Sequence, residues 1–92
     1  MPSAPKSFIS RKGALGGYEV MGWRYVEDAA WHVKAWRTSR HQHAKSYVVR
    51  DGAFDREPAI ANEKIAILSL IGQWETGLPE RVSDFLGFNN PD

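Results

Sequence analysis

The chain has 92 residues, of which 42% are hydrophobic, 12% aromatic and 25% charged, and its formal net charge is +1. This length and balance predict one folded domain with an aromatic-rich core. Cysteine is absent, which excludes disulfide bonds, a cysteine-ligated zinc site and a thiol nucleophile.

The first part of the sequence predicts two strands. Residues 1–6 contain two prolines and are expected to form a flexible arm. Residues 7–10 are typical of a short strand, and residues 11–17 contain three glycines, which predicts a turn or a loop. Apolar and polar residues alternate loosely over 18–26, which favours a second strand with Gly22 as a candidate bulge.

The stretch 27–42 is predicted to be a helix. It begins with two acidic residues, which complement the partial positive charge of a helix N-terminus. Ala29, Val33 and Trp36 would then share one face of the helix. From Trp31 onward the residues also alternate between two sides, so a strand is the alternative.

The second part of the chain predicts one strand and two helices. Residues 46–50 read as a strand that ends in an Asp51–Gly52 turn. Residues 59–77 form the clearest helix, with Pro58 suited to its first turn and Asp55 a candidate cap. Its predicted apolar face, which the other isoleucines and leucines broaden, consists of Ile60, Ala61, Ile65, Leu68 and Ile71 or Gly72.

A last, short helix is predicted over 79–88, followed by a frayed tail at 88–92. We therefore expect an α+β fold in which a small antiparallel sheet of about three strands packs against two or three helices, in the order β-β-α-β-α-α. Residues 1–92 are expected to form a single compact domain. No stretch approaches the roughly 20 apolar residues of a membrane span, and no signal peptide is recognised, so a cytoplasmic protein that does not contact membranes is expected.

Charge is divided unevenly along the chain. Residues 1–50 carry nine lysines and arginines against three acidic residues, whereas residues 51–92 carry three against eight. Such asymmetry indicates a surface that faces nucleic acid or an acidic partner. The alternative is that the two halves pack together and their charges intermix on the surface.

The segment RTSRHQHAKS, residues 37–46, concentrates this positive charge. His41 and His43 are candidate metal ligands or a ribonuclease-like acid and base, but no further ligands or catalytic motif accompany them. We therefore predict no metal, no cofactor and no catalytic residue, and keep a histidine-dependent ribonuclease as the enzyme alternative.

A binding surface requires only that basic residues cluster. We predict a surface for an anionic partner or for nucleic acid, and the alternative is a solvated helix face. Aromatic residues are interleaved with these bases, and although most should be buried, an exposed tryptophan would favour binding. The predicted binding residues are Arg24, Lys34, Arg37, Arg40, His41 and Lys45.

With its basic segment GWRYVEDAAWHVKAWRTSRHQHAK, residues 22–45, the chain resembles the small phage-encoded anti-CRISPR proteins that act on type I surveillance complexes. The resemblance rests on the size and character of the whole chain. It implies a monomeric, stoichiometric inhibitor in the host bacterial cytoplasm that docks on Cas proteins, with or without contacts to guide-RNA phosphates, and blocks target DNA binding. A small DNA- or RNA-binding regulator is the alternative.

Overall fold

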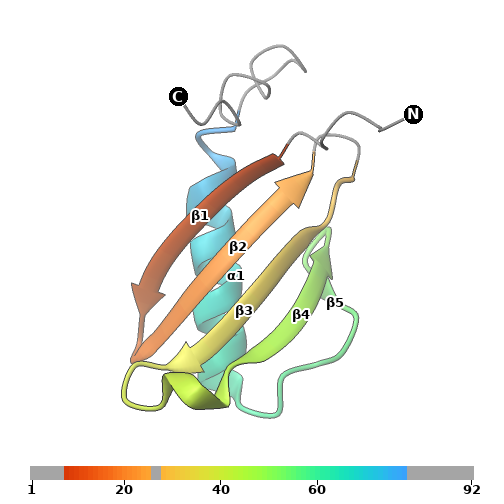
Figure 1. The fold of residues 1–92 in the computed structure, drawn as a ribbon. Coiled ribbons are helices and arrows are strands. Elements are labelled where there is room, and N and C mark those ends of the chain that lie inside the picture. Colours follow the sequence, from red (N-terminus) through yellow and green to blue (C-terminus); the bar gives the residue numbers. More distant parts are fainter. Residues whose placement is uncertain (1–7, 26–27, 79–92) are drawn as a thin grey trace, which may run out of the picture.

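A computed structural model describes residues 8–25 and 28–78, which form a five-stranded antiparallel sheet with one helix on one face (Figure 1). The strands follow one another in the sheet in chain order, so each pairs with the next along the sequence. The elements are β1 (Phe8–Leu15), β2 (Tyr18–Tyr25), β3 (Trp31–Arg37), β4 (Lys45–Arg50), β5 (Ala53–Phe54) and α1 (Ala61–Glu75), with a short 3₁₀ helix (His41–His43) between β3 and β4.

The predicted fold of about three strands and two or three helices is therefore wrong, because the described chain has five strands and one α-helix. The predicted arm at 1–6, the helix at 79–88 and the tail at 88–92 lie outside the described residues.

The largest correction concerns residues 27–42, which were expected to be helical. Their main element is β3, which pairs with β2 on one side and with β4 on the other. Trp31, Val33 and Ala35 are all buried beneath α1, and the residues between them point to the other face of the sheet. In a strand, residues two apart point to the same face, so all three side chains are buried together. In a helix the same residues would be spread around the axis.

Tight turns connect β1 to β2 and β4 to β5. Residues 11–15, expected to be part of a loop, instead continue β1, and only Gly16 and Gly17 make the turn, with φ of 60° and 84°. The predicted Asp51–Gly52 turn is confirmed, with φ of 53° and 80°. Positive φ at both central residues matches the twist of an antiparallel hairpin and explains the use of Gly and Asp-Gly.

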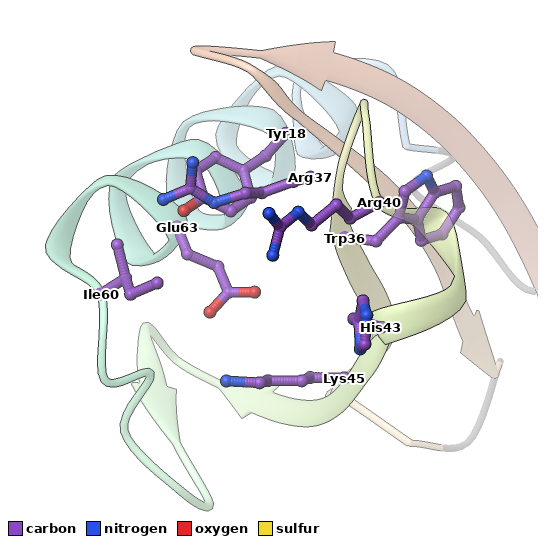
Figure 2. Close-up of a pocket in the computed structure, with 8 residues that line it drawn as sticks. All are labelled: Tyr18, Trp36, Arg37, Arg40, His43, Lys45, Ile60 and Glu63. Carbon is purple, nitrogen blue, oxygen red and sulfur yellow. The ribbon is translucent and has the colours of Figure 1, made fainter.

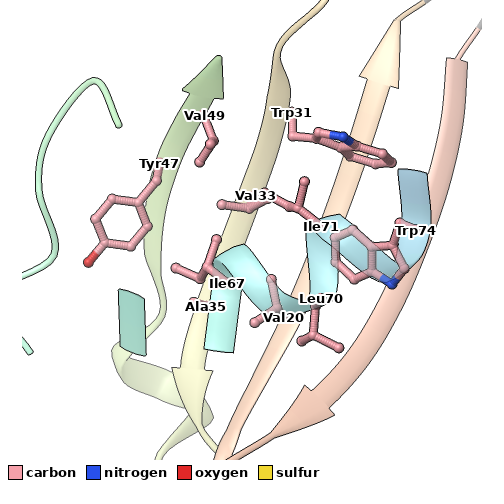
Figure 3. Packing of buried hydrophobic residues seen from close by; sticks show 10 residues of the cluster. All are labelled: Val20, Trp31, Val33, Ala35, Tyr47, Val49, Ile67, Leu70, Ile71 and Trp74. Atoms are coloured by element: carbon pink, nitrogen blue, oxygen red, sulfur yellow. The ribbon is translucent and has the colours of Figure 1, made fainter. Parts of the chain in front are cut away.

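The core lies between α1 and the face of the sheet that the helix covers (Figure 3). Trp31 and Trp74 meet with ring centroids 5.3 Å apart. Gly22 is not a bulge: it pairs regularly with Arg11 and Val33. A Cβ at this position would lie 2.6 Å from the ring of Trp74, so glycine allows the helix to approach the sheet closely.

Helix α1 differs from its prediction in where it begins and which side it buries. Its N-cap is Ile60 rather than the expected Asp55, and no side chain makes a capping hydrogen bond. Ile65, assigned to the predicted apolar face, is 58% exposed, and the buried face instead centres on Ile67 and Leu70. In the described part of the chain, no helix combines the length and the apolar character needed to cross a membrane.

Polar side chains cover the outer edge of β4 beyond the two residues of β5. The backbone N–H of Val48 donates to the Asp55 carboxylate at 2.9 Å, and the Asp55 N–H donates to the Val48 carbonyl at 2.9 Å. Arg56 donates to the carbonyl of Ser46 at 3.2 Å. The chain after β5 therefore satisfies backbone groups that an edge strand otherwise exposes.

Replacing Gly22 tests the close approach of the helix. Gly22→Ala should lower the free energy of unfolding by about 1–3 kcal/mol, since Trp74 is held between the sheet and Trp31 and has little room to move. Gly13→Ala should cost less, because its Cβ would meet only the flexible end of Leu70. Urea denaturation of both variants measures the difference.

The control for this series is Gly72→Ala, where the added Cβ would meet no atom of the described residues within 4 Å beyond its own segment of the helix. This change should raise stability by about 0.5–1 kcal/mol through helix propensity. Equal effects of Gly22→Ala and Gly13→Ala would contradict the role assigned to Trp74.

Candidate functional site

Three of the predicted binding residues come together at one end of the sheet. Arg37 ends β3, Arg40 lies in the connection that follows, and Lys45 begins β4. All three line one cavity of about 190 Å³, together with His43 (Figure 2). The antiparallel pairing of β3 with β4 produces this arrangement, because it returns the chain to the end of the sheet from which it left.

The other three predicted residues are not part of this cluster. Arg24 lies near the opposite end of β2, where it forms an ion pair of 3.0 Å with Glu75 of the helix. Lys34 lies on the face of the sheet that α1 does not cover. His41 belongs to the short 3₁₀ helix, and its side chain lies outside the described part of the structure.

We call this cavity the sheet-end cavity and define it by the residues that line it. They come from the start of β2, the end of β3, the connection to β4, the start of β4 and the N-terminal end of α1. Five of them were not among the predicted binding residues, although His43 was a candidate metal ligand or catalytic group. The lining residues are Tyr18, Trp36, Arg37, Arg40, His43, Lys45, Ile60 and Glu63.

The cations of the sheet-end cavity lack acidic partners within the described chain. Arg37, Arg40 and Lys45 take part in none of the four ion pairs found among the described residues. The Arg37 guanidinium lies 5.6 Å from the centre of the Tyr18 ring, a cation–π contact that orients it. The positive charge at this end of the sheet therefore remains available to a ligand.

Glu63 is the one carboxylate among the described residues that line the cavity, and it is 4% exposed. The Tyr47 hydroxyl donates a hydrogen bond of 3.0 Å to its Oε1. Burial of the phenol, reinforced by the Glu63 carboxylate, raises the pKa of Tyr47 to about 12. This hydrogen bond joins β4 to the first turn of α1 and fixes the carboxylate at the cavity wall.

The second face of the sheet carries aromatic side chains and is covered by no described helix or strand (Figure 1). We call it the open face. Trp23 stacks on His32 with a centroid distance of 6.5 Å and an interplanar angle of 15°. Tyr25 packs edge-on against His32 at 5.7 Å, and Phe8 lies 5.8 Å from Tyr25.

The open face also contains a shallow cavity of about 180 Å³, in which Trp23 and Lys34 line the same space. Trp23 and Trp36 are only half-buried, in contrast to Trp31 and Trp74. An exposed tryptophan was the feature expected to favour binding, and these two tryptophans are exposed only in part. Alternation along β2 and β3 would have predicted this face once 27–42 was recognised as a strand.

Asp28 links His32 of β3 to Arg50 of β4. Its carboxylate accepts a hydrogen bond of 3.1 Å from the Ala30 N–H, and it contacts His32 at 3.4 Å and Arg50 at 3.0 Å. The Ala30 hydrogen bond, with His32 and Arg50 acting in the same direction, lowers the pKa of Asp28 below its ordinary value. These contacts orient the imidazole against which Trp23 stacks.

The structure gives limited support to the other site hypotheses. Among residues 8–25 and 28–78, no three His, Asp or Glu side chains are grouped so that they could hold a metal ion. The histidine pair proposed for RNA cleavage stays a prediction, because only His43 has a described side chain.

Tyr47→Phe tests the hydrogen bond that supports the cavity wall. It should lower the free energy of unfolding by about 1–3 kcal/mol, since a buried carboxylate loses its donor. The double variant Tyr47→Phe, Glu63→Met should lose less, because both polar partners are then removed.

The same pair predicts a pH dependence. Tyr47 has an ordinary pKa of 10.0 and a folded pKa of about 12, so its stabilisation is complete below pH 10 and is lost as the pH rises toward 12. The gap in melting temperature between the unmodified protein and Tyr47→Phe should narrow over that window. A gap that stays constant from about pH 9 to pH 12 would contradict the raised pKa.

The sequence matches no protein-family model, and no curated protein or solved structure is significantly similar to it.

Proposed function

We propose that this chain is a non-enzymatic binding protein whose partner is single-stranded nucleic acid. The observation that carries the proposal is the cluster of Arg37, Arg40 and Lys45 around the sheet-end cavity, with no ion pair to a described carboxylate. Unpaired cations that converge on one hollow suit phosphate groups, whose attraction sums over contacts.

The open face supplies the second half of such an interface. Single strands bind to surfaces that combine cations with aromatic rings, because every base has a face that can stack. Trp23 and Lys34 line one cavity on this face. Trp36 also points to the open face, where it lies opposite Glu19, and it lines the sheet-end cavity as well. Trp36 is thus shared by the open face and the sheet-end cavity, and we propose that a strand crossing the open face reaches the basic cluster past this residue.

The proposal predicts that removing two cations weakens binding and its dependence on salt. Arg37→Gln, Arg40→Gln should bind a fluorescein-labelled oligo(U) or oligo(dT) strand more weakly than the unmodified protein. The slope of log K against log salt concentration should become shallower by about 1.4, since each lost phosphate contact on a single strand contributes about 0.7. Fluorescence anisotropy at several salt concentrations measures both quantities.

The matched control removes the same net charge elsewhere, through Arg11→Gln, Lys64→Gln on β1 and α1. It should leave the salt slope unchanged, because neither residue lines the sheet-end cavity or the cavity on the open face. Melting temperatures should show that both double variants fold. Equal weakening by the two variants would mean that only net charge matters, and the assigned surface would be wrong.

A second candidate function is the stoichiometric inhibitor that docks on a type I CRISPR surveillance complex. It is favoured by the large apolar side chains of the open face, since Phe8 and Met21 are each 41% exposed. Apolar and aromatic groups of this kind form the centre of protein–protein interfaces. In this proposal the protein acts in the host bacterial cytoplasm, and the basic cluster contacts Cas subunits or guide-RNA phosphates.

A pull-down from lysate of a bacterium that carries a type I system separates the two candidates. Recovery of Cas subunits that survives nuclease treatment and is lost in Met21→Asp would support the inhibitor. Recovery of nucleic acid alone, lost after nuclease, would support the first candidate and contradict the second. Met21 is exposed on the open face, so this substitution should not affect folding.

A further inference from the structure

We propose that the sheet-end cavity binds a single phosphomonoester group, as carried by a nucleoside monophosphate or by the phosphorylated end of a nucleic-acid strand. The inference deepens the proposed nucleic-acid binding and rests on it for the longer ligand. It concerns the cavity itself, which has about 190 Å³ of space and shares Trp36 with the open face.

The charge of the lining residues fits a dianion. Arg37, Arg40 and Lys45 supply three positive charges and Glu63 one negative charge, so the lining carries +2 with His43 neutral. A phosphomonoester carries about −1.5 to −2 at pH 7, whereas each phosphodiester within a strand carries a single negative charge. The excess positive charge is therefore matched by a terminal phosphate better than by an internal one.

The lining groups approach the cavity from several directions, which suits them to bind the three terminal oxygens of one phosphate rather than a single oxygen. Arg37 and Arg40 approach the cavity from β3 and its following turn, Lys45 approaches from β4, and Glu63 faces them from the helix (Figure 2). Guanidinium groups donate two parallel hydrogen bonds to a phosphate, and a lysine adds a third donor from another direction. The N-terminal end of α1 contributes a partial positive charge at the same wall.

Tyr18 gives an independent indication that the cavity can bind a group with an acceptor atom. This residue lines the cavity and is 4% exposed, yet its hydroxyl has no hydrogen-bond partner among the described residues. Buried hydroxyl groups are normally paired, because an unpaired one forfeits its hydrogen bonds to water. A phosphate oxygen in the cavity would be an acceptor for this hydroxyl beside the Arg37 guanidinium that lies over its ring.

Glu63 limits the ligand to one phosphate. Its carboxylate is held by Tyr47 and is buried, so it cannot swing into solvent to make room for a second anion. A diphosphate would place additional negative charge against it. A hydroxyl or amino group next to the phosphate, as in a nucleoside, would instead donate a hydrogen bond to it, and Trp36 and Ile60 offer apolar contacts for the base.

Competition binding tests the inference with four ligands and the full chain. The ligands are a 5′-phosphorylated oligo(U), the same strand with a 5′-hydroxyl, uridine monophosphate and uridine diphosphate. We expect the phosphorylated strand to bind about tenfold more tightly than the hydroxyl strand, the effect of about one charge-assisted hydrogen bond. Uridine monophosphate should displace the phosphorylated strand more effectively than uridine diphosphate does.

Variants at exposed positions keep the test independent of folding. Lys45→Gln should abolish the preference for the phosphorylated strand and leave the melting temperature unchanged, since Lys45 is exposed and makes no ion pair with a described residue. The matched control Lys12→Gln, on the open face of β1, should retain the preference. Glu63 is buried, so its variant needs a melting temperature that shows folding. Glu63→Gln keeps an acceptor for Tyr47 and should reverse the order of the monophosphate and the diphosphate.

The outcomes separate this inference from the proposed function. Equal binding of the two strands would overturn the phosphomonoester site while leaving single-strand binding intact. Binding of the monophosphate without binding of either strand would support the cavity and contradict the proposed function. A preference that survives Lys45→Gln would show that the phosphate binds elsewhere and would overturn the assignment.

Discussion

The contact between Trp74 and the backbone at Gly22 determines how helix α1 lies on the sheet. Glycine lets the indole approach to a distance that a Cβ would forbid, and Trp31 packs against the same ring. Eleven residues earlier, about 16 Å along the helix axis, Glu63 reaches Tyr47 of β4. The helix is thus fixed at both ends, and the N-terminal end closes one wall of the sheet-end cavity. The described helix covers one face, and no element of residues 8–25 and 28–78 covers the aromatic residues of the other face.

The sequence predicted the parts of the fold that have a single strong signal. β2, β4, the Asp51–Gly52 turn and α1 were all expected from alternation, turn residues and length. Residues 31–37 satisfied both a helical and an extended pattern, and only the pairing with β2 and β4 decides between them. The buried side of α1 was also ambiguous, because isoleucine and leucine surround the helix and Gly22, rather than helix periodicity, fixes its orientation.

The site was predictable where neighbours in sequence remain neighbours in space. Arg37, Arg40 and Lys45 flank one connection, so their clustering could be anticipated without knowing the fold. Tyr18 and Glu63 reach the same cavity from β2 and α1, and no spacing rule links them to that segment. In the sequence Arg24 seemed equivalent to the other basic residues. It lies near the opposite end of the sheet, however, where it forms an ion pair with Glu75.

The hydrogen bonds that Asp55 and Arg56 make to β4 have a consequence for self-association. They occupy backbone groups of one outer strand, whereas no described residue pairs with the outer side of β1. Exposed strand edges accept strands from other molecules. A symmetric antiparallel pairing of two copies through β1 would place Arg11 of each copy opposite Lys12 of the other, at the centre of the strand. The edge at β4 is thus protected by hydrogen bonds, and the edge at β1 by repulsion between like charges. Only the repulsion at β1 weakens as ionic strength rises.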